Sequence, residues 1–311
     1  MNIVCVESLG IPQARFENLK ARYNSLGHTF EYYMDRREDA ETLADRMREA
    51  DAVVISNIKL TAEVLAQCPR LRYLSVAFTG LDHIDLEYCK NHGIEVQNAA
   101  GYSTTAVSEL AVGMMLDLLR NIVTLSEMTH QGGSRGTFLG RELRGKTVGI
   151  VGTGAIGTAT IRLLLAFGAK VVAWSRTRRP EVEALGVTYM GLEELLKQSD
   201  IVSLHVPLNN ETRGLIGEKE LDLMKPTALL VNTARGPVCD IAAVGKALVD
   251  GRIAGTAFDV FEQEPPLPLD HLLLSTNRCL VTPHVAFATE ESFAARADIV
   301  FGHVDEWLQR Q

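Results

Sequence analysis

The sequence lacks the features of a membrane-spanning or exported protein. No apolar run reaches the roughly 18 residues that a transmembrane helix needs. The first residues, Met1 to Glu7, contain no basic segment followed by an apolar core, as a signal peptide would. We therefore expect a cytoplasmic protein that has no membrane partner.

Cysteine pairs and basic clusters are also missing. The five cysteines lie far apart, and neither C-x-x-C nor a Cys/His zinc pattern occurs. We expect reduced thiols, mostly structural, and no metal site. The net charge of −8 and the lack of a Lys/Arg block interleaved with aromatics argue against a nucleic-acid partner.

What the sequence does contain is an alternation of short apolar runs with helical segments, which is typical of α/β folds with parallel sheets. At 311 residues, 46% of them hydrophobic, the chain is long enough for two domains. The expected strands are 3–6, a weak one near 30, 52–55, 73–78, 94–96, 147–151, 170–174, 201–206, 228–231, 255–258 and 279–281. The expected helices of the first block are 12–26, 40–49 and 62–67.

Two further helical segments define the domain organisation. A helix predicted over 103–128, with apolar residues at helical spacing, connects the two blocks. The last helical segment, 283–307, is too short for a domain and should pack on the first block. We therefore expect a discontinuous substrate domain of residues 1–98 and 285–311 with a Rossmann domain of residues 99–284 inserted in it. Both domains are expected to be Rossmann-like or flavodoxin-like.

A glycine motif carries the strongest functional signal. An apolar strand runs directly into Gly152-x-Gly154-x-x-Gly157, the spacing of a dinucleotide-binding turn. The first glycine permits the tight turn, the second lets the backbone approach a pyrophosphate, and the third lets the next helix pack on the strand. A helix over 158–167 and the strand 170–174 would complete a βαβ unit. The alternative, a glycine-rich turn that binds no nucleotide, stays open.

Three charged side chains lie beyond predicted strands of the second block, where doubly wound sheets bind ligands. Arg235 offers a planar guanidinium that can hold a carboxylate by two hydrogen bonds. Glu264 belongs to an acidic loop stiffened by prolines, and His284 follows an X-Pro step directly after a strand. Each residue alone could equally be an ordinary loop residue, so the combination is what indicates a site.

This combination resembles the D-2-hydroxyacid dehydrogenase family. The resemblance also covers residues 79–85 (TGLDHID) and 103–110 (STTAVSEL), so it extends over nearly the whole chain. It implies hydride transfer between a nicotinamide and C2 of a 2-oxo acid, with Arg235, Glu264 and His284 as the catalytic residues. His284 would be the general acid, Glu264 would favour its imidazolium form and orient the ring, and Arg235 would clamp the substrate carboxylate.

The resemblance implies small substrates. Backbone N–H groups around Phe78, Thr79 and Gly80 would complete the carboxylate cradle, and Phe78 and Phe287 would line the pocket. The aromatic Phe287 after Pro283-His284-Val285-Ala286 is similar to that of hydroxypyruvate reductases, so we favour glyoxylate or hydroxypyruvate. Another D-2-hydroxyacid dehydrogenase, a phosphite dehydrogenase and a dinucleotide-sensing regulator like the C-terminal binding protein corepressors remain alternatives.

The cofactor is expected to be NADPH, with NADH possible. The acidic residue that usually binds the ribose of NAD about 20 residues after the glycines is replaced by Ser175-Arg176-Thr177, which suits a 2′-phosphate. Further cofactor contacts are expected from Thr104, Ala155, Ile156, His205, Val206, Pro207, Thr212, Thr233, Ala234 and Asp259. For His205 the backbone matters more than the imidazole, and we do not expect it to be catalytic. The resemblance also implies a homodimer.

Overall fold

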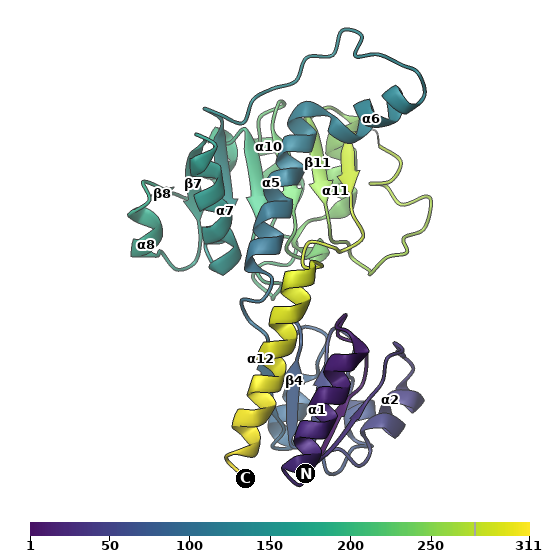
Figure 1. Cartoon of the computed structure of the whole chain (residues 1–311). Coiled ribbons are helices and arrows are strands. Elements are labelled where there is room, and N and C mark those ends of the chain that lie inside the picture. The colour runs from purple at the N-terminus through teal and green to yellow at the C-terminus, as the bar shows by residue number, and fades with distance from the viewer. Residues whose placement is uncertain (277) are drawn as a thin grey trace. The chain divides into compact units, whose positions relative to one another are not determined.

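The computed structural model describes residues 1–276 and 278–311 and divides into two compact units (Figure 1). Unit 1 comprises Met1–Ser103 and Ala288–Gln311, and unit 2 comprises Thr104–Phe287. Each unit is built on a parallel sheet flanked by helices, which confirms the predicted fold class.

Unit 1 has a five-stranded sheet in the flavodoxin-like order β2-β1-β3-β4-β5. Its strands are β1 (Asn2–Cys5), β2 (Thr29–Tyr32), β3 (Ala52–Ile55), β4 (Tyr73–Val76) and β5 (Glu95–Asn98). Its helices are α1 (Gln13–Ser25), α2 (Ala40–Met47), α3 (Ala62–Leu65), α4 (Leu86–Asn91) and α12 (Glu290–Leu308).

The C-terminal helix α12 lies beside α1 and against β4, far from both in sequence (Figure 1). The hydroxyl of Ser75 on β4 donates to the carbonyl oxygen of Val300 at 3.0 Å, and the Tyr73 and Trp307 rings stack with centroids 5.2 Å apart. The side chain of Thr289 caps the helix by accepting from the N–H of Ser292. These contacts make the last residues of the chain part of the unit 1 core.

Unit 2 has a seven-stranded sheet in the order β12-β11-β10-β9-β6-β7-β8. Its strands are β6 (Thr147–Val151), β7 (Lys170–Trp174), β8 (Thr188–Tyr189), β9 (Ile201–Leu204), β10 (Leu229–Asn232), β11 (Gly255–Phe258) and β12 (Cys279–Val281). Its helices are α5 (Thr104–Arg120), α6 (Ile122–His130), α7 (Ala155–Ala166), α8 (Pro180–Glu183), α9 (Leu192–Gln198), α10 (Glu218–Leu223), η1 (Gly236–Val238) and α11 (Ile241–Val249). The strand order reverses between β6 and β9, and this switch point is where such sheets bind ligands.

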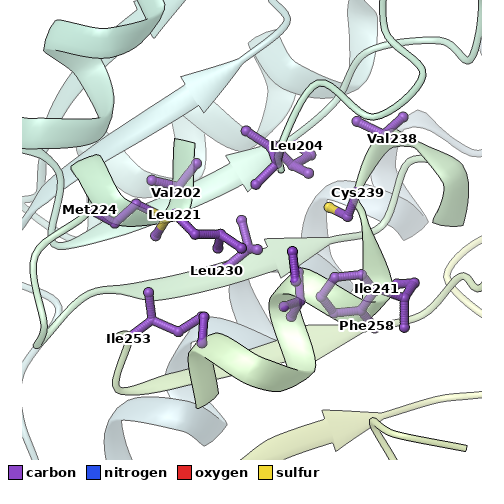
Figure 2. Packing of buried hydrophobic residues seen from close by; sticks show 14 of the residues in the cluster. Val202, Leu204, Leu221, Met224, Leu230, Val238, Cys239, Ile241, Ile253 and Phe258 are labelled. Atoms are coloured by element: carbon purple, nitrogen blue, oxygen red, sulfur yellow. The ribbon is translucent and has the colours of Figure 1, made fainter. Parts of the chain in front are cut away.

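Successive residues of the unit 2 strands face opposite sides and form two cores. On one side, Val202, Leu230 and Phe258 pack with Leu221 of α10 and Ile241 of α11 (Figure 2). The residues next to them in the strands, such as Ile201, Leu229 and Ala257, belong to the core beneath α5 and α7. Because both faces are covered, most residues of the strands are apolar, as in other buried parallel sheets.

The predicted helix over 103–128 is wrong as a single element, because the structure ends α5 at Arg120 and starts α6 at Ile122. The break lies at Asn121, which adopts φ +51°, a left-handed conformation that asparagine tolerates better than most residues. The carboxylate of Asp117 accepts from the N–H of Val123 and so caps the new helix. The apolar periodicity continues through this break, so it could not reveal it.

Other predicted helices differ at their ends. α7 starts at Ala155 instead of 158, directly after the glycine turn, and α3 ends at Leu65 instead of 67. α12 starts at Glu290 instead of 283, because residues 283–289 form the turn that carries His284. None of the helices of the described residues is both long and apolar enough to cross a membrane.

Candidate active site

A glycine-rich turn lies at the carboxyl end of β6, one of the two strands at the switch point. Gly152 adopts φ +100°, and a Cβ there would lie 2.7 Å from the carbonyl oxygen of His205. A Cβ on Gly157 would lie 2.0 Å from the carbonyl oxygen of Gly152, so only glycine lets α7 pack this closely. A Cβ on Gly154 would meet no atom within 4 Å, so this position faces open space.

The N-terminus of α7 meets the requirements of a pyrophosphate site. Gly154 is its N-cap and offers no side chain to the first-turn N–H groups, among them those of Ala155 and Ile156. A helix leaves these groups without an intrahelical partner, and its dipole is positive at this end. The turn therefore fits the pyrophosphate of a dinucleotide.

The two glycines are expected to respond differently to alanine. Gly157→Ala should lower the melting temperature of the protein without ligands, because its Cβ would overlap the Gly152 carbonyl. Gly154→Ala should leave that melting temperature unchanged but raise the Kd of the dinucleotide about tenfold or more, because its Cβ fills the space next to the helix N-terminus. Thermal melts and fluorescence titration measure both. Unchanged dinucleotide affinity of Gly154→Ala would contradict the assigned site.

The carboxyl end of β7 carries the predicted ribose-phosphate segment. The N–H of Gly152 donates to the carbonyl oxygen of Trp174 at 2.7 Å, so Ser175 directly follows a residue bonded to the glycine turn. The guanidinium of Arg176 is exposed and lies 3.3 Å from the carboxylate of Glu211. Thr177 is also exposed. The segment thus presents a hydroxyl group and guanidinium groups beside the turn.

The residues around β9 form the other side of the switch point. The imidazole of His205 contacts the Ser203 hydroxyl through Nε2 at 3.0 Å, while its buried Nδ1 has no hydrogen-bond partner among the described residues. Burial lowers the pKa of His205 to about 4, so the ring is neutral at pH 7 and unsuited to act as a cationic acid. The hydroxyl of Thr212 donates to the carbonyl oxygen of Pro207 and closes the loop after Val206.

Arg235 lies on a tight turn at the end of β10. The buried amide of Asn232 accepts from the N–H of Ala234 at 3.0 Å and donates to the carbonyl oxygen of Arg235 at 2.9 Å, which fixes the turn. The guanidinium donates to the Ala234 carbonyl oxygen at 2.8 Å. The Thr233 hydroxyl is buried and has no partner among the described residues, as expected of a group that receives a ligand.

Glu264 and His284 are brought together although twenty residues separate them (284 − 264). Nδ1 of His284 lies 2.9 Å from both carboxylate oxygens of Glu264. A carboxylate only accepts, so the proton on this side belongs to Nδ1, and Nε2 is left as the nitrogen that can exchange a proton with a substrate. His284 adopts φ +54°, a strained backbone conformation of the kind that clusters at functional sites.

Asp259 holds the turn that carries His284. Its carboxylate is fully buried and accepts from the hydroxyl of Thr282 at 2.6 Å and from the N–H groups of Val285 and Ala286 at 2.9 and 2.8 Å. Burial raises the pKa of Asp259, and these three hydrogen bonds partly offset that rise. The N–H of His284 donates to the Asp259 carbonyl oxygen at 2.8 Å. Asp259 therefore fixes the backbone of His284, and its predicted contact with the cofactor stays a prediction.

The Arg235 turn packs on the loop that contains Glu264. A Cβ on Gly236 would lie 1.9 Å from the carbonyl carbon of Phe261, so the two backbones pack directly on each other. Near the end of unit 2, the Phe287 ring meets the His284 imidazole edge to face with centroids 5.6 Å apart. Unit 2 thus carries the three predicted catalytic residues on loops that brace one another.

The remaining predicted substrate residues, Phe78, Thr79 and Gly80, belong to unit 1 and follow β4. Phe78 is buried, Thr79 is exposed, and among the described residues no protein acceptor takes the N–H of Thr79 or Gly80. Thr104, a predicted cofactor residue, is the first residue of α5 in unit 2.

Sequence reasoning missed Tyr189 and the positioning role of Asn232. The hydroxyl of Tyr189 donates to the Thr153 hydroxyl at 2.8 Å and accepts from the N–H of Arg179 at 3.3 Å, so it joins the glycine turn to the arginine segment. The two-residue strand that carries it gives no periodic signal. Among residues 1–276 and 278–311, no group of three or more His, Cys, Asp or Glu side chains could hold a metal ion.

Comparisons with known proteins identify relatives of this chain. The profile described as D-isomer specific 2-hydroxyacid dehydrogenase, NAD binding domain, matches residues 112–286. The glyoxylate reductase of Thermococcus litoralis is 41% identical over 268 residues, which cover 83% of this chain and 80% of that protein.

Two solved structures share the whole architecture. An acyclic imino acid reductase in complex with NADPH and D-Arg superposes with a TM-score of 0.89 at 28% identity, covering 100% of this chain and 98% of that one. The D-lactate dehydrogenase of Aquifex aeolicus, complexed with NAD and lactic acid, gives 0.86 at 32% identity, covering 98% and 95%. The same unit contains a glycine turn that fits a dinucleotide and a paired histidine and glutamate. This chain belongs to the D-isomer specific 2-hydroxyacid dehydrogenase family of NAD(P)-dependent oxidoreductases.

Proposed function

We propose that the protein uses NADPH to reduce glyoxylate to glycolate or hydroxypyruvate to D-glycerate. The observation that carries the proposal is the contact of His284 Nδ1 with both oxygens of Glu264, in the unit that holds the glycine turn. The relative from Thermococcus litoralis supports glyoxylate, because it is a glyoxylate reductase. The Phe287 ring beside His284 supports a small substrate.

The residues suggest a division of roles. The glycine turn would hold the pyrophosphate of the dinucleotide, whose reduced nicotinamide would supply the hydride for the carbonyl carbon of the substrate. Nε2 of His284 delivers a proton to the carbonyl oxygen as negative charge develops there, while Glu264 holds Nδ1 and stabilises the ring. Arg235 binds the substrate carboxylate and polarises the carbonyl group. For unit 1 we propose the role of the substrate domain, in which the N–H groups after Phe78 serve as a cradle for a carboxylate.

The preference for NADPH is supported by the segment after β7. An NAD-specific site has an acidic side chain here that accepts from the ribose hydroxyls and repels a 2′-phosphate. This chain has Ser175, and the adjacent Arg176 is exposed and forms an ion pair with Glu211, which is exposed as well. A surface ion pair of this kind contributes little, so the guanidinium can exchange Glu211 for a phosphate.

The test is a table of kcat/KM for the reduction of glyoxylate, hydroxypyruvate and pyruvate with NADPH or NADH, and for the oxidation of phosphite with NADP+ or NAD+. We expect the highest value for one of the first two substrates with NADPH. A higher value for pyruvate or phosphite would reassign the substrate, and a higher value with NADH would reverse the cofactor. No turnover with any of them would favour the regulator alternative.

We also propose a homodimer that involves α6 and the loop after it. Ile122, Val123 and Met128 expose apolar side chains on α6, and Leu139 in the loop is 79% exposed. Apolar side chains that gather on one surface mark interaction sites. Met114 and Met115 are instead buried in the core beneath α5.

For the location of the protein we propose the cytoplasm. All five cysteines are free thiols. Four of them are buried, and Cys279 is partly exposed. Such thiols are typical of a reducing compartment.

A further inference from the structure

The loop after β4 is tied down through its carbonyl oxygens. The carbonyl oxygen of Phe78 accepts from the N–H of Ala99 at 3.2 Å. The carbonyl oxygen of Thr79 accepts from the side-chain amide of Asn98, the last residue of β5. The N–H groups of Thr79 and Gly80 find no protein acceptor among the described residues.

Because a peptide group is planar, the hydrogen bonds of these two carbonyl oxygens also determine where the N–H groups of the same peptides point. In a trans peptide the C=O and the N–H of the following residue point in opposite directions. A Thr79 carbonyl held by Asn98 therefore turns the N–H of Gly80 away from β5, and a Phe78 carbonyl held by Ala99 does the same for the N–H of Thr79. Successive N–H groups that point out together form a concave site for an anion.

Only one of the two hydrogen bonds that hold the loop is donated by a side chain. Any residue but proline could supply the N–H of Ala99, whereas the bond to Thr79 needs the Nδ2 of Asn98. Asn98 lies opposite Val76 in the β4–β5 register, one strand width from the start of the loop. Its amide is thus placed by the sheet itself and not by another loop.

The other side of the loop is braced independently. The Phe78 ring meets the His83 imidazole edge to face at 6.0 Å, and Nε2 of His83 donates to the carbonyl oxygen of Ser56 at 2.8 Å. The N–H of Ser56 in turn donates to the buried carboxylate of Glu7 at 2.8 Å. Loss of the Asn98 amide should therefore free the peptide between Thr79 and Gly80 without releasing the whole loop.

We propose that Asn98 is a positioning residue for substrate binding: by holding the carbonyl of Thr79, it directs the N–H of Gly80 at the substrate carboxylate. This inference rests on the proposed function of the loop as a carboxylate cradle. The contact to the carboxylate is the same in the ground state and the transition state, because the carboxylate does not react. Its loss should therefore raise KM and leave kcat nearly unchanged.

The experiment compares Asn98→Ala and Asn98→Leu with wild type, using glyoxylate and its methyl ester at saturating NADPH. Leucine keeps the branching of the asparagine side chain and removes the donor. We expect both variants to raise KM for glyoxylate about tenfold, the effect of one hydrogen bond to a charged group, with kcat changed less than twofold. The ester carries no carboxylate, so its kcat/KM should stay the same and the preference for the acid should fall about tenfold.

Gln97→Ala is the matched control, because Gln97 is the preceding residue of β5 and its side chain bonds Tyr73 instead of the loop. It should keep the wild-type preference for the acid. If wild type itself does not prefer glyoxylate to the ester, the proposed carboxylate site is wrong. If wild type prefers the acid and both Asn98 variants keep that preference, the positioning role of Asn98 is overturned while the proposed function stands.

Discussion

Replacement of His284 by alanine is expected to lower kcat for the 2-oxo acid by about 10²–10⁴-fold, the usual contribution of a positioned general acid. The reason is that Nε2 is the nitrogen of the ring left to deliver a proton, since Nδ1 is held by Glu264. The Kd of NADPH, measured by fluorescence titration, should change less than twofold, because no main-chain group of the glycine turn is altered. Turnover within threefold of wild type would remove His284 from the mechanism.

The neighbouring carboxylates provide a matched pair of variants for this prediction. Glu264→Gln keeps the shape of the side chain but loses the negative charge next to Nδ1 of His284, so it should lower kcat about tenfold or more. Glu262 lies on the same loop and contacts His271 at 3.3 Å, so Glu262→Gln should lower kcat at most about twofold. Equal losses of kcat in the two variants would mean that catalysis depends on the loop as a whole and not on the pairing of Glu264 with His284.

Replacement of Ser175 by aspartate is expected to reverse the cofactor preference. A carboxylate at this position would repel a 2′-phosphate and accept from the ribose hydroxyls instead. We expect kcat/KM with NADPH to fall about 10- to 100-fold, which corresponds to the loss of one or two charge-assisted hydrogen bonds. The value with NADH should stay the same or rise.

Ser25→Asp adds the same charge at an exposed serine of α1 and serves as the control. Both cofactors should then react as with wild type. If Ser175→Asp lowers kcat/KM equally with NADPH and NADH, the segment does not discriminate between them.

The positions of the strands could be predicted from the sequence because a buried parallel strand is a short apolar run between turn residues. The strands 52–55, 170–174, 255–258 and 279–281 were predicted with the observed bounds. The break at Asn121 could not be predicted, because it depends on a left-handed residue and a bond from Asp117, neither of which disturbs the apolar pattern.

The residues of the candidate site could be predicted from the sequence, but their arrangement in space could not. The sequence indicated Glu264 and His284, and the structure adds which ring nitrogen faces the carboxylate. Asp259 was predicted as a cofactor residue, whereas the structure shows its carboxylate bonded to the turn of residues 282–286. Asn98 went unnoticed because a side chain that anchors a distant carbonyl leaves no pattern in its own strand.

The proposed function requires hydride transfer to C2 of a 2-oxo acid, with the D-isomer as the product when C2 becomes a stereocentre. The most direct measurement is the reduction of hydroxypyruvate with NADPH that carries two deuterium atoms at C4 of the nicotinamide, followed by chiral separation and mass spectrometry of the glycerate. We expect D-glycerate with one deuterium at C2. L-glycerate, or D-glycerate without the label, would contradict it.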